Sequence, residues 1–246
     1  MKGGVGKTSV SANLAAALAT HLGVGHVGVV DLDPQDALQW HLGVHDEPYP
    51  GICHQSLSGE EWGPVARPSK FGVDCLPYGD VTEAERVAFE SLLSQQPDWV
   101  VSQLELSGFH PDGMVIIDTP PGPTVYLKQV CACADIVLAV VLADAGSYAT
   151  IPAMETWLDE ARQTRPDLKV HYLLNQVDRN DPLNRDTVAF LRKNLPSSLC
   201  PIEIHTDEAA SEALALQQPV FVYEPHSQAS SDIARLAVWI MGELDP

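Results

Sequence analysis

The stretch that most restricts the fold is the glycine-rich start of the chain, MKGGVGKTS. Its spacing matches a phosphate-binding loop at every position but the first, where Met1 stands in place of glycine. Gly3, Gly4 and Gly6 allow the backbone to turn sharply and to point its N–H groups inward at phosphate oxygens. Because such a loop connects the end of a β-strand to the start of an α-helix, it predicts an α/β protein that binds a nucleotide.

The last residues of this loop supply the chemistry of phosphate binding. Lys7 can reach the β- and γ-phosphates, and the Thr8 hydroxyl can ligate Mg²⁺. The helix that follows adds the positive end of its dipole. We therefore expect ATP and Mg²⁺ as cofactors, and a nucleotide site that includes Lys2, Gly3, Gly4, Val5, Gly6, Lys7, Thr8 and Ser9.

Helical and strand-like segments alternate along the rest of the chain. Helices are predicted at 9–22, 82–96, 147–163, 184–195 and 230–244. Short apolar runs with polar, Gly or Pro endings predict strands at 26–33, 73–79, 113–122, 135–144 and 168–178. This alternation predicts a doubly wound, mostly parallel sheet with helices on both faces, in a single P-loop NTPase domain over 1–246. Residues 40–70 are expected to be irregular, with one short helix.

Polar residues follow three of the predicted strands. Asp31 and Asp33 stand in DLDPQ, Asp118 and Gly122 in DTPPG, and Asn175 in NQVD. Because the carboxyl ends of parallel strands meet at one edge of a sheet, we expect these residues near the phosphate loop. Asp118 is placed to assist magnesium, Gly122 to sense a γ-phosphate and the Asn175 amide to read the adenine edge. The expected metal set is Thr8, Asp31 and Asp118.

A second lysine ahead of the glycines narrows the class of nucleotide-binding protein. From spacing alone, Lys2 is a solvated lysine near the N-terminus. However, KGGVGKT resembles the deviant phosphate loop of the MinD and ParA ATPases. That resemblance implies that Lys2 crosses to the nucleotide of a partner protomer when two protomers enclose two ATP molecules. It also implies that Asp33 orients the attacking water, that Lys2, Lys7 and Asp33 are the catalytic residues, and that DTPPG is a switch segment.

Four later segments are similar to the BcsQ family of cellulose-biosynthesis proteins. The resemblance implies a slow, regulatory ATPase that works as an ATP-dependent homodimer in bacterial cellulose secretion. It also implies partners like the small protein BcsR and the cyclic-di-GMP-sensing protein BcsE. The segments are PGPTVYLKQ (121–129), LADAGSYATIPAME (142–155), NQVDRNDPLNRDTVAFLR (175–192) and IHTDEAASEALALQQPVFVYEPHSQASSDIARLAVWI (204–240).

The start of the chain departs from this family pattern. In the family, an apolar strand in the middle of the sheet precedes the early lysine, whereas here only Met1 precedes it. A sheet that lacked a central strand would leave backbone groups unpaired and an apolar slot open. We therefore expect that Met1 is not the true start and that an upstream strand exists.

The charge of the chain separates the rival functions. Asp and Glu number 33 against 14 Lys and Arg, which gives a formal charge of −19, and the basic residues are scattered along the sequence. Such a protein repels nucleic acid, which argues against a DNA-partition ATPase. The last predicted helix lacks the basic face of a membrane-surface helix, which argues against a MinD-like positioning protein and predicts no direct membrane insertion.

We expect a cytoplasmic protein, recruited to the inner membrane through partners. A metabolic ATP-dependent ligase or kinase on the same fold remains an alternative.

Overall fold

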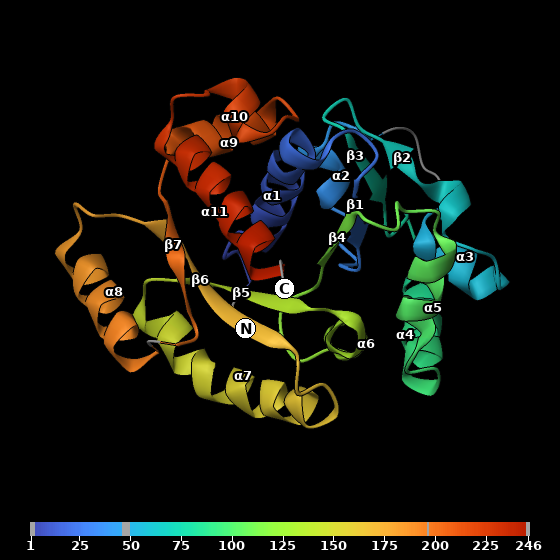
Figure 1. Ribbon diagram of the computed structural model, residues 1–246. Helices are drawn as coiled ribbons and strands as arrows, with labels where there is room; N and C mark the ends of the chain where they lie inside the picture. The colour runs from blue at the N-terminus through green and yellow to red at the C-terminus, as the bar shows by residue number, and fades with distance from the viewer. Residues whose placement is uncertain (1–2, 46–49, 196, 245–246) are drawn as a thin grey trace.

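The computed structural model describes residues 3–45, 50–195 and 197–244. Two sheets form its centre, one of four strands and one of three (Figure 1). The four-stranded sheet has the order β2-β3-β1-β4 and the three-stranded sheet the order β5-β6-β7. Met1 and Lys2, including the position predicted to cross to a partner, lie outside the described residues.

The four-stranded sheet is parallel except at one edge. β1 (Val27–Asp31) lies between β3 (Val73–Leu76) and β4 (Met114–Asp118) and is parallel to both, while the short β2 (Arg67–Pro68) pairs antiparallel with β3. All five residues of β1 are buried, as an apolar run covered on both faces requires. In the register of β1 and β4, Asp31 lies opposite Asp118, so two carboxylates end neighbouring strands.

The three-stranded sheet is parallel throughout. Its strands are β5 (Ile136–Leu142), β6 (Lys169–Val177) and β7 (Leu199–His205). The pairing of β6 with β7 is irregular after Tyr172 and again after Leu174. β7 was not predicted from the sequence because Pro201 and Glu203 interrupt its apolar residues.

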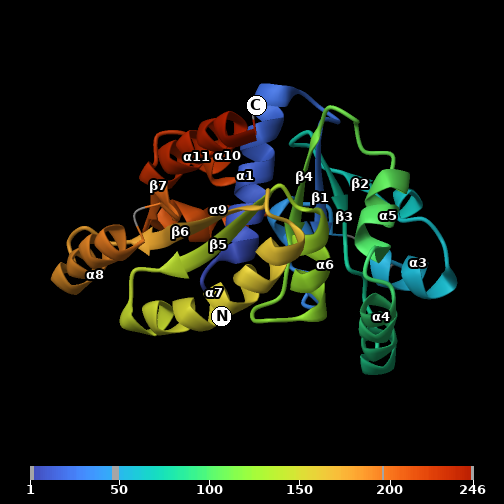
Figure 2. The ribbon, with the colours of Figure 1, turned by 60° about the horizontal axis from the view of Figure 1, so that its bottom comes forward.

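No described strand lies between β4 and β5, and the two sheets are not hydrogen-bonded to each other. Helix α1 (Lys7–Leu22) stands between them in both ribbon views (Figures 1 and 2). Apolar residues of α1, β1, β4 and β5 share one hydrophobic cluster, which joins the two sheets through side chains. The upstream strand proposed from the sequence stays a prediction.

Helices cover both faces of this split sheet, as predicted. On one face, α1 packs with α11 (Gln228–Leu244), and the predicted stripe of Ile233, Leu236, Ala237 and Ile240 is buried there. The other face is covered by α4 (Glu83–Gln95), α6 (Val125–Cys133), α7 (Ala145–Thr164) and α8 (Pro182–Asn194). The remaining helices are α2 (Leu38–His41), α3 (Ile52–Ser58), α5 (Trp99–Leu106), α9 (Glu208–Ala215) and α10 (Val220–Tyr223), with a 3₁₀ turn at Gly63–Val65.

Local signals explain where several helices begin. α4 starts with a capping box in which Thr82 accepts from the Glu85 N–H and the Glu85 carboxylate accepts from the Thr82 N–H. α8 starts with Asp181 as N-cap and Pro182 in its first turn. The segment 40–70, expected to hold one short helix, contains α3, the 3₁₀ turn and β2.

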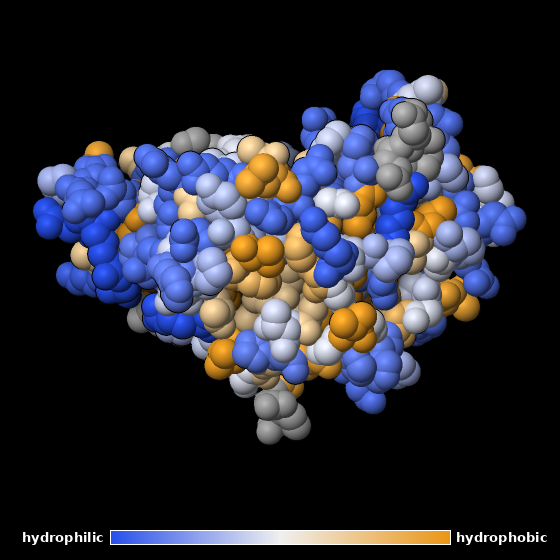
Figure 3. All heavy atoms as spheres, turned by 90° about the horizontal axis from the view of Figure 1, so that it is seen from above, coloured by the Kyte–Doolittle hydropathy of each residue, from blue (hydrophilic) through white to orange (hydrophobic). Residues whose placement is uncertain are grey.

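One face of the molecular surface is coloured by hydropathy in Figure 3. Seen from above, it is mostly hydrophilic, with apolar and near-neutral side chains gathered across its centre (Figure 3). None of the helices in the described part of the chain combines the length and the apolar character needed to cross a bilayer.

Candidate functional site

The glycine-rich loop turns directly into α1, which begins at Lys7. Gly4 and Gly6 have φ angles of 74° and 86°, a region that residues with a side chain rarely adopt. A Cβ on Gly6 would also lie 2.4 Å from Nδ2 of Asn175. Glycine at position 6 is therefore required both by the backbone turn and by the close approach of Asn175.

The start of α1 is open to an anion. Among the described residues, no side chain caps this helix or accepts a hydrogen bond from the N–H groups of its first turn. An uncapped helix start attracts phosphate through these N–H groups and the helix dipole. The short helices α2, α5 and α10 also lack a side-chain cap, whereas five other helices begin with a side chain that accepts a backbone N–H, namely Thr82, Thr124, Asp144, Asp181 and Asp207.

Two hydroxyl groups of α1 hold the carboxylate that ends β4. The Thr8 hydroxyl donates to Oδ2 of Asp118 at 2.6 Å, and the Ser11 hydroxyl donates to Oδ1 at 3.0 Å. Asp118 is almost fully buried. Burial raises its pKa, and the bonds from Thr8 and Ser11, together with the charge of Lys7, act against that rise.

The neighbouring strand β1 ends in a second buried carboxylate. Oδ1 of Asp31 accepts the Asp33 N–H at 2.9 Å, and Oδ2 accepts the Leu38 N–H at 3.0 Å. Burial and then the nearby Asp118 charge raise the pKa of Asp31 well above its ordinary value. Within the described chain, no Lys, Arg or His lies in ion-pair distance of Asp31 or Asp118, so this pair lacks a bound counter-charge.

The donor set at this position suits Mg²⁺. Mg²⁺ prefers oxygen ligands and is commonly held by one or two carboxylates together with substrate phosphates. The hydroxyl of Thr8 and the carboxylate of Asp118 already lie within hydrogen-bond distance of each other beside the uncapped helix. Asp31 instead has both oxygens engaged with the loop that carries Asp33. Among the described residues, no group of three His, Cys, Asp or Glu side chains is arranged to hold a metal by itself.

The remaining predicted residues lie around this centre. Asp33 is half-buried, and its Oδ1 accepts the Gln35 N–H at 3.0 Å. Gly122 follows β4 with a φ of 95°. The Asn175 amide is buried at the irregular end of β6 and donates to the Val5 carbonyl at 2.8 Å. Asn175 thus supports the phosphate loop, and its predicted contact with adenine stays a prediction.

Two residues of the site were missed in the sequence. Ser11 lies one helical turn after Thr8, a spacing that places both hydroxyls on one face of α1 and was an available signal. Asp36 accepts the N–H groups of Tyr78 and Gly79 at 2.9 and 3.1 Å, and so ties the loop after β1 to the loop after β3. This contact spans 42 residues and has no local signal.

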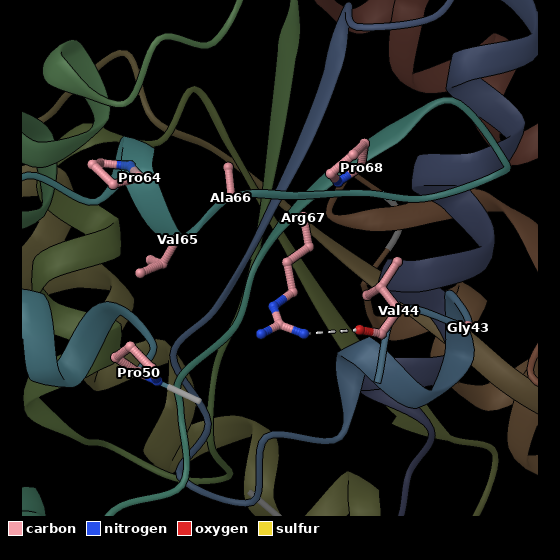
Figure 4. Close-up of a pocket in the computed structure, with 8 residues that line it drawn as sticks. All are labelled: Gly43, Val44, Pro50, Pro64, Val65, Ala66, Arg67 and Pro68. Atoms are coloured by element: carbon pink, nitrogen blue, oxygen red, sulfur yellow. Dashed lines mark hydrogen bonds between the residues drawn. The ribbon is translucent and has the colours of Figure 1, made fainter. Parts of the chain in front are cut away.

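A separate cavity of about 520 Å³ lies away from this centre, beside β2 (Figure 4). The Arg67 guanidinium points into it and donates to the Val44 carbonyl at 3.4 Å. None of the predicted site residues lines this cavity. Its walls are Gly43, Val44, Pro50, Pro64, Val65, Ala66, Arg67 and Pro68.

Comparison with known proteins identifies the family. The family model described as cellulose biosynthesis protein BcsQ matches residues 1–241. The chain belongs to this family. A BcsQ protein of Salmonella typhimurium is 28% identical over 98% of this chain and 91% of its own length. A ParA family protein of Chlamydia trachomatis is 26% identical over 96% of this chain and 92% of its own length. The family resemblance seen in the sequence is confirmed.

Solved structures confirm the predicted fold. The cell division ATPase MinD of Pyrococcus furiosus superposes with a TM-score of 0.77 at 22% identity, covering 98% of this chain and 95% of that one. Cobyrinic acid a,c-diamide synthase of Mycobacterium smegmatis, with a bound ATP analog and magnesium, gives a TM-score of 0.74 at 22% identity and covers 98% and 91%. At these identities the likeness establishes the fold, and function must be argued from the site.

Proposed function

We propose that this protein is an ATPase that acts as an ATP-dependent dimeric switch in bacterial cellulose biosynthesis and secretion. The observation that carries the proposal is the uncapped start of α1 beside Thr8 and the buried pair of Asp31 and Asp118. A helix start that attracts anions suits the phosphates of Mg-ATP, and a buried carboxylate pair with no described cation in ion-pair distance suits its metal. Membership of the BcsQ family supports the link to cellulose.

Each residue of the site has a role in this proposal. Backbone N–H groups from Gly3 to Ser9 surround the phosphates, and Lys7 neutralises the charge that develops during phosphoryl transfer. Thr8 and Asp118 would hold Mg²⁺, which would supply charge neutralisation at the β- and γ-phosphates. Asp31, through its two backbone hydrogen bonds, positions the loop of Asp33.

Hydrolysis in this scheme is slow and serves regulation. Asp33 is half-buried, beside the predicted phosphate position, and would orient the attacking water. Gly122 would respond to the γ-phosphate. Lys2 of a second protomer would complete the site, which makes ATP the condition for dimer formation.

The dimer would act through other proteins of the cellulose secretion machine, of the BcsR-like and BcsE-like kinds. A cytoplasmic location with recruitment to the inner membrane through those partners fits the acidic charge of −19. The same charge disfavours direct binding to anionic lipid.

The test is the solution mass of an Asp33→Ala variant in Mg-ATP and in Mg-ADP, measured by light scattering. We expect a dimer in Mg-ATP alone, because loss of water positioning traps the ATP state. The dimer should disappear when Lys2→Ala is added and persist when the exposed Lys128→Ala is added instead. A well-folded monomer in both nucleotides would refute the switch and favour a metabolic enzyme on this fold.

A further inference from the structure

A second cavity, of about 430 Å³, lies between α8 and the ends of β6 and β7. Helix α8 stands at the outer edge of the molecule, beside the three-stranded sheet (Figures 1 and 2). None of the residues assigned to the nucleotide site lines this cavity. Its walls are Val177, Arg179, Arg185, Val188, Ala189, Arg192 and Glu203.

Positive charge is concentrated around this cavity. Three of the eight arginines of the chain line it, so the basic residues that looked scattered in the sequence are partly gathered in space. Arg185 and Arg192 lie two helical turns apart on α8, on the same face as Val188, and Arg179 reaches the cavity from the loop before the helix. The expectation of scattered basic residues was therefore wrong at this position, because spacing along the sequence hides a cluster built from a helix and a loop.

One carboxylate partly balances these three guanidinium groups. Glu203 on β7 is buried, with 7% of its side chain exposed, and accepts from Nη2 of Arg192 at 2.6 Å. Nη2 of Arg179 lies 4.0 Å from the same carboxylate. Within the described chain, Arg185 forms no ion pair and no side-chain hydrogen bond. The walls thus carry two positive charges beyond the single negative one, next to the exposed Ala189, with Val177 and Val188 almost fully buried behind it.

We propose that this cavity, the arginine pocket, binds an acidic segment of a partner protein, with an aspartate or glutamate on the guanidinium groups and an apolar side chain against Ala189. Arginine pairs with carboxylates through two parallel hydrogen bonds, and Arg185 has its donors available. Its volume of about 430 Å³ lies in the range of ligand-binding pockets. This inference goes beyond the proposed ATPase and does not depend on it.

Two other anionic ligands fit the pocket less well. A nucleic acid carries phosphates along its whole length, and most of them would meet a protein of charge −19. A free nucleotide would find no aromatic ring to stack on and no glycine-rich turn among the lining residues. A short acidic segment places its charge at the pocket alone.

The test uses the full chain without nucleotide and a fluorescein-labelled peptide of alternating aspartate and leucine. The comparison peptide has asparagine in place of aspartate, and binding is followed by fluorescence anisotropy at low ionic strength. We expect only the acidic peptide to bind. Arg185→Gln should weaken it about tenfold, the loss of one charge-assisted hydrogen bond, and Arg185→Lys should recover only part of it.

The matched control is Lys193→Gln, which removes the same charge from the same helix at an exposed position that does not line the pocket. Binding should survive this change. Equal losses in Lys193→Gln and Arg185→Gln, or no binding of the acidic peptide, would overturn the proposal. Displacement of the peptide by inorganic phosphate or by a single-stranded oligonucleotide at lower concentration than by free acidic peptide would also overturn it. Thermal melts of each variant verify that the fold is retained, and Arg185 is chosen first because it supports no described contact.

Discussion

The described chain buries four carboxylates, two beside each sheet, and the two pairs have opposite surroundings. In the four-stranded half, Asp31 and Asp118 are held by hydroxyl and backbone N–H groups, without a described cation in ion-pair distance. In the three-stranded half, Glu203 pairs with Arg192. Asp232, on α11 against β7, accepts from the His205 N–H and lies 2.7 Å from Nδ1 of His205.

The contrast separates buried carboxylates that lack a described cation from buried carboxylates that already have a partner. A buried charge is costly unless it is paired, so an unpaired cluster persists where a ligand supplies the missing charge. The compensated pair of Glu203 and Asp232 already has partners within the chain, Arg192 and His205, and needs no further cation. The uncompensated pair of Asp31 and Asp118 needs a further cation, which the proposed Mg-ATP would provide.

The largest expected effect is on activity at the uncompensated pair. Asp118→Asn should lower ATP hydrolysis about 10³-fold, or about 4 kcal/mol, because it removes the charge that would hold the metal. The melting temperature of the nucleotide-free protein should stay the same or rise, since repulsion with Asp31 is relieved. Phosphate release and calorimetry measure the two outcomes. Full hydrolysis by this variant would place the metal elsewhere.

At the compensated pair we expect a loss of stability without a loss of activity. Asp232→Ala leaves the buried groups that it satisfies without a partner and should lower the free energy of unfolding by about 3–4 kcal/mol. Hydrolysis per folded molecule should be unchanged. Denaturant titration and an activity assay on the same samples check both. A variant that is stable but inactive would contradict the structural role that we assign to Asp232.

Acid should lower the stability of the four-stranded half, because this half contains a buried histidine, His41. Burial lowers the pKa of His41 to about 4 from its ordinary 6.5, so the folded protein favours the neutral ring. Above pH 6.5 His41 is neutral in both the folded and the unfolded state. As the pH falls from 6.5 toward 4, the unfolded state takes up the proton first, which lowers the free energy of unfolding by up to about 3 kcal/mol. The raised pKa values of Asp31 and Asp118 act in the other direction. The difference between wild type and His41→Leu in melts from pH 7.5 to 4 isolates the histidine, and parallel curves would contradict its burial as a neutral group.

The two halves also differ in how far the sequence predicts them. Thr8, Asp31 and Asp118 could be found because the phosphate loop and the polar strand ends are local patterns, and the fold brings strand ends together. Asp232 and Glu203 could not, since their partners lie 27 and 11 residues away and follow no motif. The arginine pocket could not be predicted either, because its residues come from a loop, a helix and a strand that follow no common motif.

Secondary structure shows the same division. The predicted segments at 82–96 and 230–244 became α4 and α11 because capping residues and apolar periodicity are properties of neighbouring residues. β7 was missed because Pro201 and Glu203 interrupt its apolar residues, and the packing of α11 that buries it is not a local property. Asn175 was predicted to lie near the phosphate loop, but its hydrogen bond to the Val5 carbonyl, 170 residues away, was not.

The smallest expected effect is that of replacing Asn175, whose amide joins the phosphate loop to the three-stranded half. Asn175→Ala leaves the Val5 carbonyl without its amide donor and should cost about 1–2 kcal/mol of stability. If the amide serves the loop, the affinities for ATP and GTP fall together, by less than about tenfold. If it reads the base instead, only ATP binding weakens. Equilibrium binding of both nucleotides to Asn175→Ala, with the exposed Asn194→Ala as control, separates a residue that holds the two halves together from one that selects adenine.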